Sequence, residues 1–165
     1  WYTKVKSPVE LVAGVLRLTG EIDRPRREML DRHLQAVYMG QYLNNPPGVE
    51  GWHEGTDWLD TGTLVERVNF ATQQMGDSKK PGVQAMISNI ASSAEGGISP
   101  ERLVGECLDQ MGALSVSEDT RRVLIDFASM GGGSAIVPGT TDQQARQQIA
   151  AVLQMVASTQ EFQRS

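Results

Sequence analysis

Several features that define large protein classes are missing from this sequence. It has a single cysteine, Cys107, among 165 residues, so no internal disulfide can form. No apolar run approaches the ~20 residues that a membrane-spanning helix needs. The chain has no charged-then-apolar signal segment at its start, which is Trp1 rather than methionine. With 39% apolar residues, we expect one globular domain over residues 1–165.

Positive charge is also scarce. Residues 1–40 carry seven Lys/Arg and five Asp/Glu, whereas residues 41–165 carry eight and fifteen, for a net charge of −5. A nucleic-acid partner requires a basic stripe that displaces counterions from the phosphates. The tightest basic cluster, Arg24, Arg26 and Arg27, is interleaved with acidic residues, which is typical of a solvated helix start. We therefore expect no nucleic-acid partner.

Helix-start signals dominate the chain. Ser7-Pro8-Val9-Glu10 combines a capping box with proline at the first helical position, and Ser99-Pro100 is a second serine–proline start. Further starts are Asp60 or Thr61, Ser117, and Thr141 with Gln144. No segment shows the alternation that is typical of a strand. We therefore predict an all-α fold, a mostly antiparallel bundle of about six or seven helices with a long loop rich in Trp, Pro and Gly.

Apolar residues at three- and four-residue steps predict which helix faces are buried. The predicted rows are Leu30, Leu34, Val37 and Tyr38; Leu64, Val65, Val68 and Ala71; and Val123, Leu124 and Phe127. The segments near 99–111 and 117–129 are expected to form an antiparallel pair joined by a short turn. Glycine-containing stretches predict flexible segments near residues 76–82 and 131–140.

The most informative stretch is residues 44–71, NNPPGVEGWHEGTDWLDTGTLVERVNFA. Its Pro-Pro pair and bulky side chains favour one rigid shape. Trp52, His53 and Trp58 are candidate ligand-binding residues, because rigid aromatic faces can contact a sugar ring or a partner chain. The alternative, which we favour, is that both tryptophans plug the helical core and hold the loop down as a lid.

The same loop is acidic. Glu50, Glu54, Asp57 and Asp60 place four carboxylates in a glycine-containing segment with no Lys or Arg. Hard oxygen ligands suit calcium, so Glu54, Asp57 and Asp60 are candidate calcium ligands, although their spacing matches no EF-hand. A solvated acidic loop, whose carboxylates serve helix capping and turns, explains the same pattern. Zinc is not indicated, because one loop histidine falls short of a ligand set.

Nucleophilic catalysis finds little support in the residues. There is no G-x-S-x-G elbow, and Cys107 lies on the predicted buried face of a helix, where a cysteine usually acts as a small hydrophobe. We therefore expect no catalytic set and no cofactor other than the calcium considered above.

The order of several short motifs resembles a known family. They are Lys6-Ser7-Pro8-Val9-Glu10-Leu11-Val12, Met39-Gly40-Gln41, Pro46-Pro47-Gly48-Val49-Glu50-Gly51-Trp52, Trp58-Leu59, Thr63-Leu64, Arg67-Val68-Asn69-Phe70-Ala71 and Gln160-Glu161-Phe162-Gln163. Together they resemble the C-terminal part of the "domain of unknown function 1800" family. This chain departs from the family at His53-Glu54-Gly55, where a Pro-Gly-Gly-like run is usual, and at Asp60, where Asn is common.

The resemblance implies large, mostly helical bacterial proteins, many of them exported, with no agreed activity or catalytic residues. It also implies that this chain is the C-terminal portion of a longer protein. We therefore expect a non-catalytic structural or protein-interaction module of an exported or cell-surface bacterial protein. Its expected partners are other protein chains, a second copy of itself or the rest of its own polypeptide. The alternative is an accessory part of a hydrolase that acts on extracellular polymer or sulfated glycan.

Overall fold

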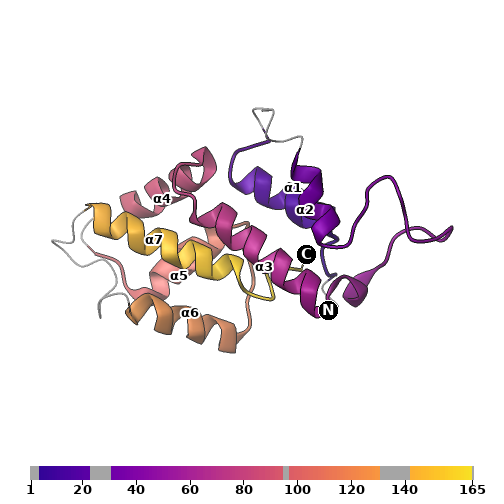
Figure 1. Ribbon diagram of the computed structural model, residues 1–165. Coiled ribbons are helices and arrows are strands. Elements are labelled where there is room, and N and C mark those ends of the chain that lie inside the picture. Colours follow the sequence, from indigo (N-terminus) through magenta and orange to yellow (C-terminus); the bar gives the residue numbers. More distant parts are fainter. Residues whose placement is uncertain (1–3, 23–30, 95–96, 131–141, 165) are drawn as a thin grey trace.

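The computed structural model describes residues 4–22, 31–94, 97–130 and 142–164, and this part of the chain is almost entirely helical (Figure 1). Its helices are α1 (Pro8–Leu18), α2 (Arg32–Tyr38), α3 (Thr61–Gly76), α4 (Pro81–Ser93), α5 (Pro100–Gln110), α6 (Glu118–Met130) and α7 (Asp142–Ala157), with a short 3-10 helix at Gly55–Trp58. The all-α prediction is confirmed. None of these helices is both long and apolar enough to cross a membrane.

The predicted helix starts follow the local sequence. Ser7 accepts a hydrogen bond from the backbone N–H of Glu10, whose side chain bonds back to the N–H of Ser7 and completes the capping box. Ser99 and Asp60 each accept from the backbone N–H three residues on. These side chains satisfy backbone donors that have no partner within the helix. The start predicted at Thr141 lies outside the described residues.

Helix α7 is the centre of the bundle. It packs against α3, α4, α5 and α6, and α3 in turn contacts α1 and α2 on its other side (Figure 1). The core is one continuous apolar cluster that includes Leu11, Val15, Phe70, Met75, Val83, Ile90, Leu103, Leu124, Ile149 and Leu153. Helices α5 and α6 also pack on each other, so the predicted pair is formed.

Each of the three predicted buried faces is wrong in part. Leu64 and Val65 of α3 are exposed, whereas Arg67 is fully buried. Helix α3 turns the side that carries Phe70, Ala71 and Met75 toward the core, and Arg67 belongs to that side. The predicted face of α6 is also partly wrong, because Leu124 is buried while Val123 and Phe127 are exposed. In α2 the error is Tyr38, which is exposed.

The two ends of the described chain are joined beside α3. Val5 and Arg164 form an isolated antiparallel bridge, and the N–H of Lys6 donates to the carbonyl of Gln163 at 3.0 Å. The guanidinium of Arg67 donates to the carbonyl of Lys6 at 2.7 Å and to Oε1 of Gln163 at 3.1 Å. Burial lowers the pKa of Arg67 to about 10, because desolvation disfavours the charged form.

The turn between α3 and α4 is packed against the end of α1. The N–H of Gly82 donates to the carbonyl of Thr19 at 2.9 Å, and buried Lys80 bonds to Glu21 at 2.6 Å and to Gln74. A segment near 76–82 was expected to be flexible; its mobility stays a prediction, although these contacts are those of an ordered turn. The other predicted flexible segment, 131–140, lies outside the described residues.

The close approach of α4 to α1 requires glycine at position 82. A Cβ on Gly82 would lie 2.0 Å from the carbonyl oxygen of Leu18, a backbone atom that cannot move aside, whereas a Cβ on Gly14 would meet nothing within 4 Å. We expect Gly82→Ala to lower the free energy of unfolding by at least about 2 kcal/mol, as overpacking does. Gly14→Ala, in the exposed middle of α1, should raise it by about 0.5–1 kcal/mol. Urea denaturation measures both, and equal effects would contradict the packing described.

Candidate functional site

A long loop, residues 41–60, leaves the bundle between α2 and α3; we call it the arm (Figure 1). Its first residue is fixed to the body, because the buried side chain of Gln41 accepts a hydrogen bond from the N–H of Val9 at 2.9 Å. Met39, two residues before Gln41, is also buried. Gly40 between them has a φ of +92°, which favours glycine and turns the chain out of α2.

The far end of the arm is fixed equally well. Trp58 is only 3% exposed, and its carbonyl accepts a hydrogen bond from the hydroxyl of Thr63 at 2.8 Å. The side chain of Asp60 caps α3 through the N–H of Thr63 at 2.9 Å. A Cβ on Gly40 would lie 3.7 Å from Cγ2 of Thr63, so both ends of the arm emerge side by side.

Between these ends the arm projects away from the helices (Figure 1). Every residue from 42 to 50 is exposed, Val49 completely so. The prediction that the loop is packed down as a lid is therefore wrong for its middle part. The reason is that the apolar contacts that fix the arm are made at its ends, by Met39 and Trp58, rather than along its length.

The two tryptophans of the arm have different environments. Trp58 is buried, as predicted, and the ring of His53 packs edge-on against it with centroids 5.7 Å apart. Trp52 is only half-buried, so the expectation that both tryptophans are core residues is wrong for this one. The structure thus brings His53 and Trp58 together and leaves part of Trp52 available for contact.

Exposed apolar side chains gather around the arm. Together with the helix ends on either side it forms the arm region, residues 38–66. Six of the ten large hydrophobic side chains that are exposed in the described part of the chain belong to it, and they are Tyr38, Tyr42, Leu43, Val49, Leu64 and Val65. Contiguous exposed apolar surface is uncommon on soluble proteins and marks interaction sites.

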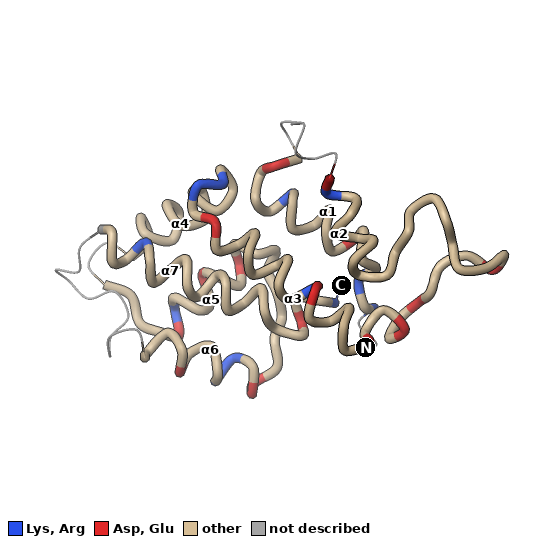
Figure 2. Tube along the Cα trace, in the orientation of Figure 1, with Lys and Arg blue, Asp and Glu red and all other residues tan. Residues whose placement is uncertain are grey.

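The arm region is also strongly acidic. It contains Glu50, Glu54, Asp57, Asp60 and Glu66 but no Lys or Arg, apart from Arg67 directly after it, which is buried (Figure 2). None of the five carboxylates forms an ion pair with another described residue.

The predicted calcium ligands do not converge. Asp60 caps α3. Glu54 lies just before the 3-10 helix and Asp57 lies on it, and both are exposed. Across residues 4–22, 31–94, 97–130 and 142–164, no three His, Cys, Asp or Glu side chains form a group that could hold a metal. Calcium binding by this loop stays a prediction, without a preformed site among the described residues.

A groove that the sequence analysis missed lies between the end of α3, α4 and α7. It has a volume of about 720 Å³, and its lining combines apolar surface, including Ile87, with polar side chains, which include Gln84, Ser88, Gln143, Gln147 and Gln154. Arg146 lines it too and donates to the hydroxyl of Ser88 at 3.3 Å. The signal in the sequence was the spacing of Gln143, Gln147 and Gln154, which places three amides along one side of a helix.

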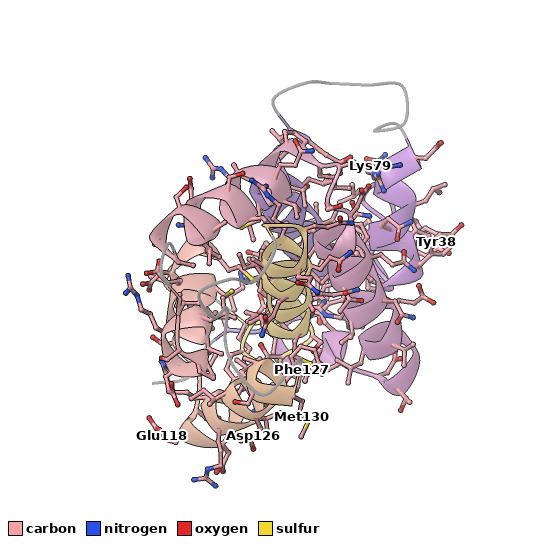
Figure 3. All side chains as sticks on the ribbon, turned by 90° about the vertical axis from the view of Figure 1, so that its left-hand side faces the viewer. Tyr38, Lys79, Glu118, Asp126, Phe127 and Met130 are labelled. Carbon is pink, nitrogen blue, oxygen red and sulfur yellow. The ribbon has the colours of Figure 1, made fainter. Side chains whose placement is uncertain are left out.

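A second exposed apolar row lies on α6, far along the chain from the arm. Val123, Phe127 and Met130 follow one another at four- and three-residue steps, and Figure 3 shows Phe127 and Met130 at one edge of the molecule. Phe127 also lines a shallow groove of about 340 Å³ against α3 and α7. Unlike the arm region, α6 carries both signs of charge, with Arg122 within 3.7 Å of Asp119.

The single cysteine is unsuited to nucleophilic chemistry. Cys107 is fully buried on α5, as predicted, and desolvation together with the nearby charge of Glu106 raises the pKa of its thiol to about 12. Because the thiolate is the reactive form, a thiol that stays protonated at neutral pH behaves as a small apolar side chain.

Comparison with known proteins gives one match. The sequence model of the family described as "Protein of unknown function (DUF1800)" matches residues 1–164, which is nearly the whole chain. Comparisons with curated proteins and with solved structures find no match.

The two arm tryptophans should differ in their contribution to stability. We expect Trp58→Ala to lower the free energy of unfolding by ~3–5 kcal/mol, because a large buried side chain is removed. Trp52→Ala should cost less than half as much, since its side chain is already partly in water. Chemical denaturation of both variants measures the difference. Equal losses would mean that Trp52 is also a core residue.

The raised pKa of Cys107 predicts a pH dependence of stability. Between about pH 8.5, where the thiol ionises in the unfolded chain, and pH 12, the folded state retains a proton that the unfolded state loses. The contribution of the Cys107 thiol to the free energy of unfolding should therefore be fully present below pH 8. Above pH 9 the free energy of unfolding should fall by up to about 1.4 kcal/mol per pH unit. The difference in unfolding free energy between wild type and Cys107→Ala, followed from pH 7.5 to 10.5, isolates this effect. A difference that does not change with pH would contradict it.

Proposed function

Because the chain belongs to the DUF1800 family of proteins of unknown function, we propose its role from its surface: it is a non-catalytic structural or protein-interaction module. The observation that carries this proposal is the arm region. It presents Tyr42, Leu43, Val49 and part of Trp52 to solvent on a loop whose two ends are fixed to the bundle.

The length of the arm supports the proposal. Before its 3-10 helix begins at Gly55, the arm runs over residues 41–54 without a helix or strand. Loops of about 12–15 residues or more without such elements are uncommon in compact domains, and are usually either functional or disordered. The buried contacts of Gln41 and Trp58 fix the ends of this one. The exposed Tyr42 and the half-buried Trp52 of the arm are of the types that are enriched in protein interfaces, where they provide a large contact area for few rotatable bonds.

An exported or cell-surface location in a bacterium completes the proposal. Its support is the resemblance to a family that is expected to have many exported members. The partners we propose are other protein chains or another part of the same polypeptide.

Site-specific photo-crosslinking of the full-length protein in bacterial cells tests both the interaction role and the exported location. A photoreactive residue in place of Val49, whose side chain is fully exposed, should give a discrete crosslinked product in the cell-envelope or secreted fraction. The matched control replaces Arg122, which is exposed on α6. Equal crosslinking at both positions, or none at Val49, would contradict the interaction module. A product confined to the cytoplasm would contradict the exported location.

One observation favours a second candidate, an accessory part of a hydrolase that acts on extracellular polymer or sulfated glycan. The groove between α3, α4 and α7 offers amide and hydroxyl groups of the kind that bind sugar hydroxyls. Its described lining includes one cation, Arg146, so it suits a neutral glycan better than a sulfated one. Glycan binding that is lost in Gln147→Ala and kept in a Val49 variant would favour this candidate over the first.

A further inference from the structure

We infer that the arm region binds a protein segment that presents Lys or Arg beside apolar side chains, as a basic amphipathic helix does. This inference rests on the proposed interaction function and specifies the chemistry of the partner. Its basis is the combination of charge and apolar exposure in residues 38–66.

The acidic and basic side chains of the arm region are of one sign, and none of its carboxylates forms an ion pair with a described residue. Five carboxylates, Glu50, Glu54, Asp57, Asp60 and Glu66, lie there without a Lys or Arg. The nearest cations along the chain are engaged elsewhere, since Arg67 is buried and Arg32 lies 3.5 Å from Glu21. A surface of one sign attracts partners of the opposite sign and repels those of its own.

Apolar and acidic side chains alternate along the region. In three places a carboxylate follows an apolar side chain within two residues: Glu50 after Val49, Glu54 after Trp52, and Glu66 after Val65. A purely apolar partner would remove these carboxylates from water without giving them a counter-charge, which is costly. A purely cationic partner would leave Tyr42, Leu43 and Val49 in water. A partner with both kinds of side chain satisfies both demands.

Charge also decides against other occupants. A second copy that paired arm region with arm region would bring the same five carboxylates against the first set, and like charges across an interface oppose association. Nucleic acids and anionic membranes carry the same sign as the arm region and are repelled in the same way.

The test uses a defined probe, an amphipathic helical peptide of Leu and Lys of about 18 residues, or five helical turns. The matched probe has Gln at every Lys position. Binding of each fluorescently labelled peptide to the chain is followed by anisotropy at about 50 mM and about 300 mM salt, because screening weakens charge-dependent binding. We expect the Lys peptide to bind at least about tenfold more tightly than the Gln peptide at low salt, and the difference to shrink at high salt.

Variants locate the site. Glu50→Gln/Glu54→Gln/Asp57→Asn removes three charges from exposed positions of the arm. Glu118→Gln/Asp119→Asn/Asp126→Asn removes the same number from exposed positions of α6, two of which are labelled in Figure 3. We expect the arm variant to weaken binding of the Lys peptide about tenfold and the α6 variant less than about twofold. Tyr42→Ser/Leu43→Ser should weaken it too, whereas Met130→Ser should not.

Each contrary result has a distinct meaning. Equal weakening by the two charge variants would show attraction to net charge alone and would overturn the inference, as would failure of the Lys peptide to bind. Equal binding of both peptides, lost in Tyr42→Ser/Leu43→Ser, would overturn the inference about charge while leaving the arm an interaction surface. Circular dichroism of every variant confirms that the substitutions, all at exposed positions, leave the fold intact.

Discussion

The buried guanidinium of Arg67 is the interaction on which the rest of this structure depends. It joins α3 to the carbonyl of Lys6 and to the side chain of Gln163, and so ties both ends of the chain to one helix. Burial lowers its pKa to about 10, which shows that holding a charge here is costly. Removing the side chain would leave its two acceptors unsatisfied in the interior, a loss of several kcal/mol. The arm ends where this helix begins, and near its other end Gln41 bonds to Val9, three residues after Lys6.

The helical bundle carries the stability of the molecule, and the recognition that we propose is assigned to the arm. The core is built from side chains of α1 and of α3 to α7 and gathers around α7, where α3, α4, α5 and α6 all pack. The arm adds only Gln41 and Trp58 to the buried interior, one near each of its ends. Its middle places apolar and acidic groups in water, where they contribute nothing to the folded state on their own. Exposed apolar patches mark interaction sites, which is why we assign the arm to binding.

Local chemistry allowed much of the fold to be predicted from the sequence. The caps at Ser7, Ser99 and Asp60 depend on neighbours three residues away, and all three were predicted. The buried side of α3 was not, because Leu64 and Val65 look like core residues and Arg67 does not; only packing against α7 and the chain ends decides between them. The same holds for the arm. Its residues were identified as a candidate site, but the difference between buried Trp58 and half-buried Trp52 depends on contacts that no local pattern encodes.

The most direct measurement concerns the middle of the arm. Residues 43–50 would be replaced by a Gly-Ser sequence of equal length, and the free energy of unfolding would be compared with wild type by urea denaturation. If the arm serves recognition rather than stability, the two values agree within about 1.5 kcal/mol, because the residues removed are all exposed. A loss of more than about 3 kcal/mol would show that these side chains belong to the core, and would contradict the account of the arm as a surface presented to a partner.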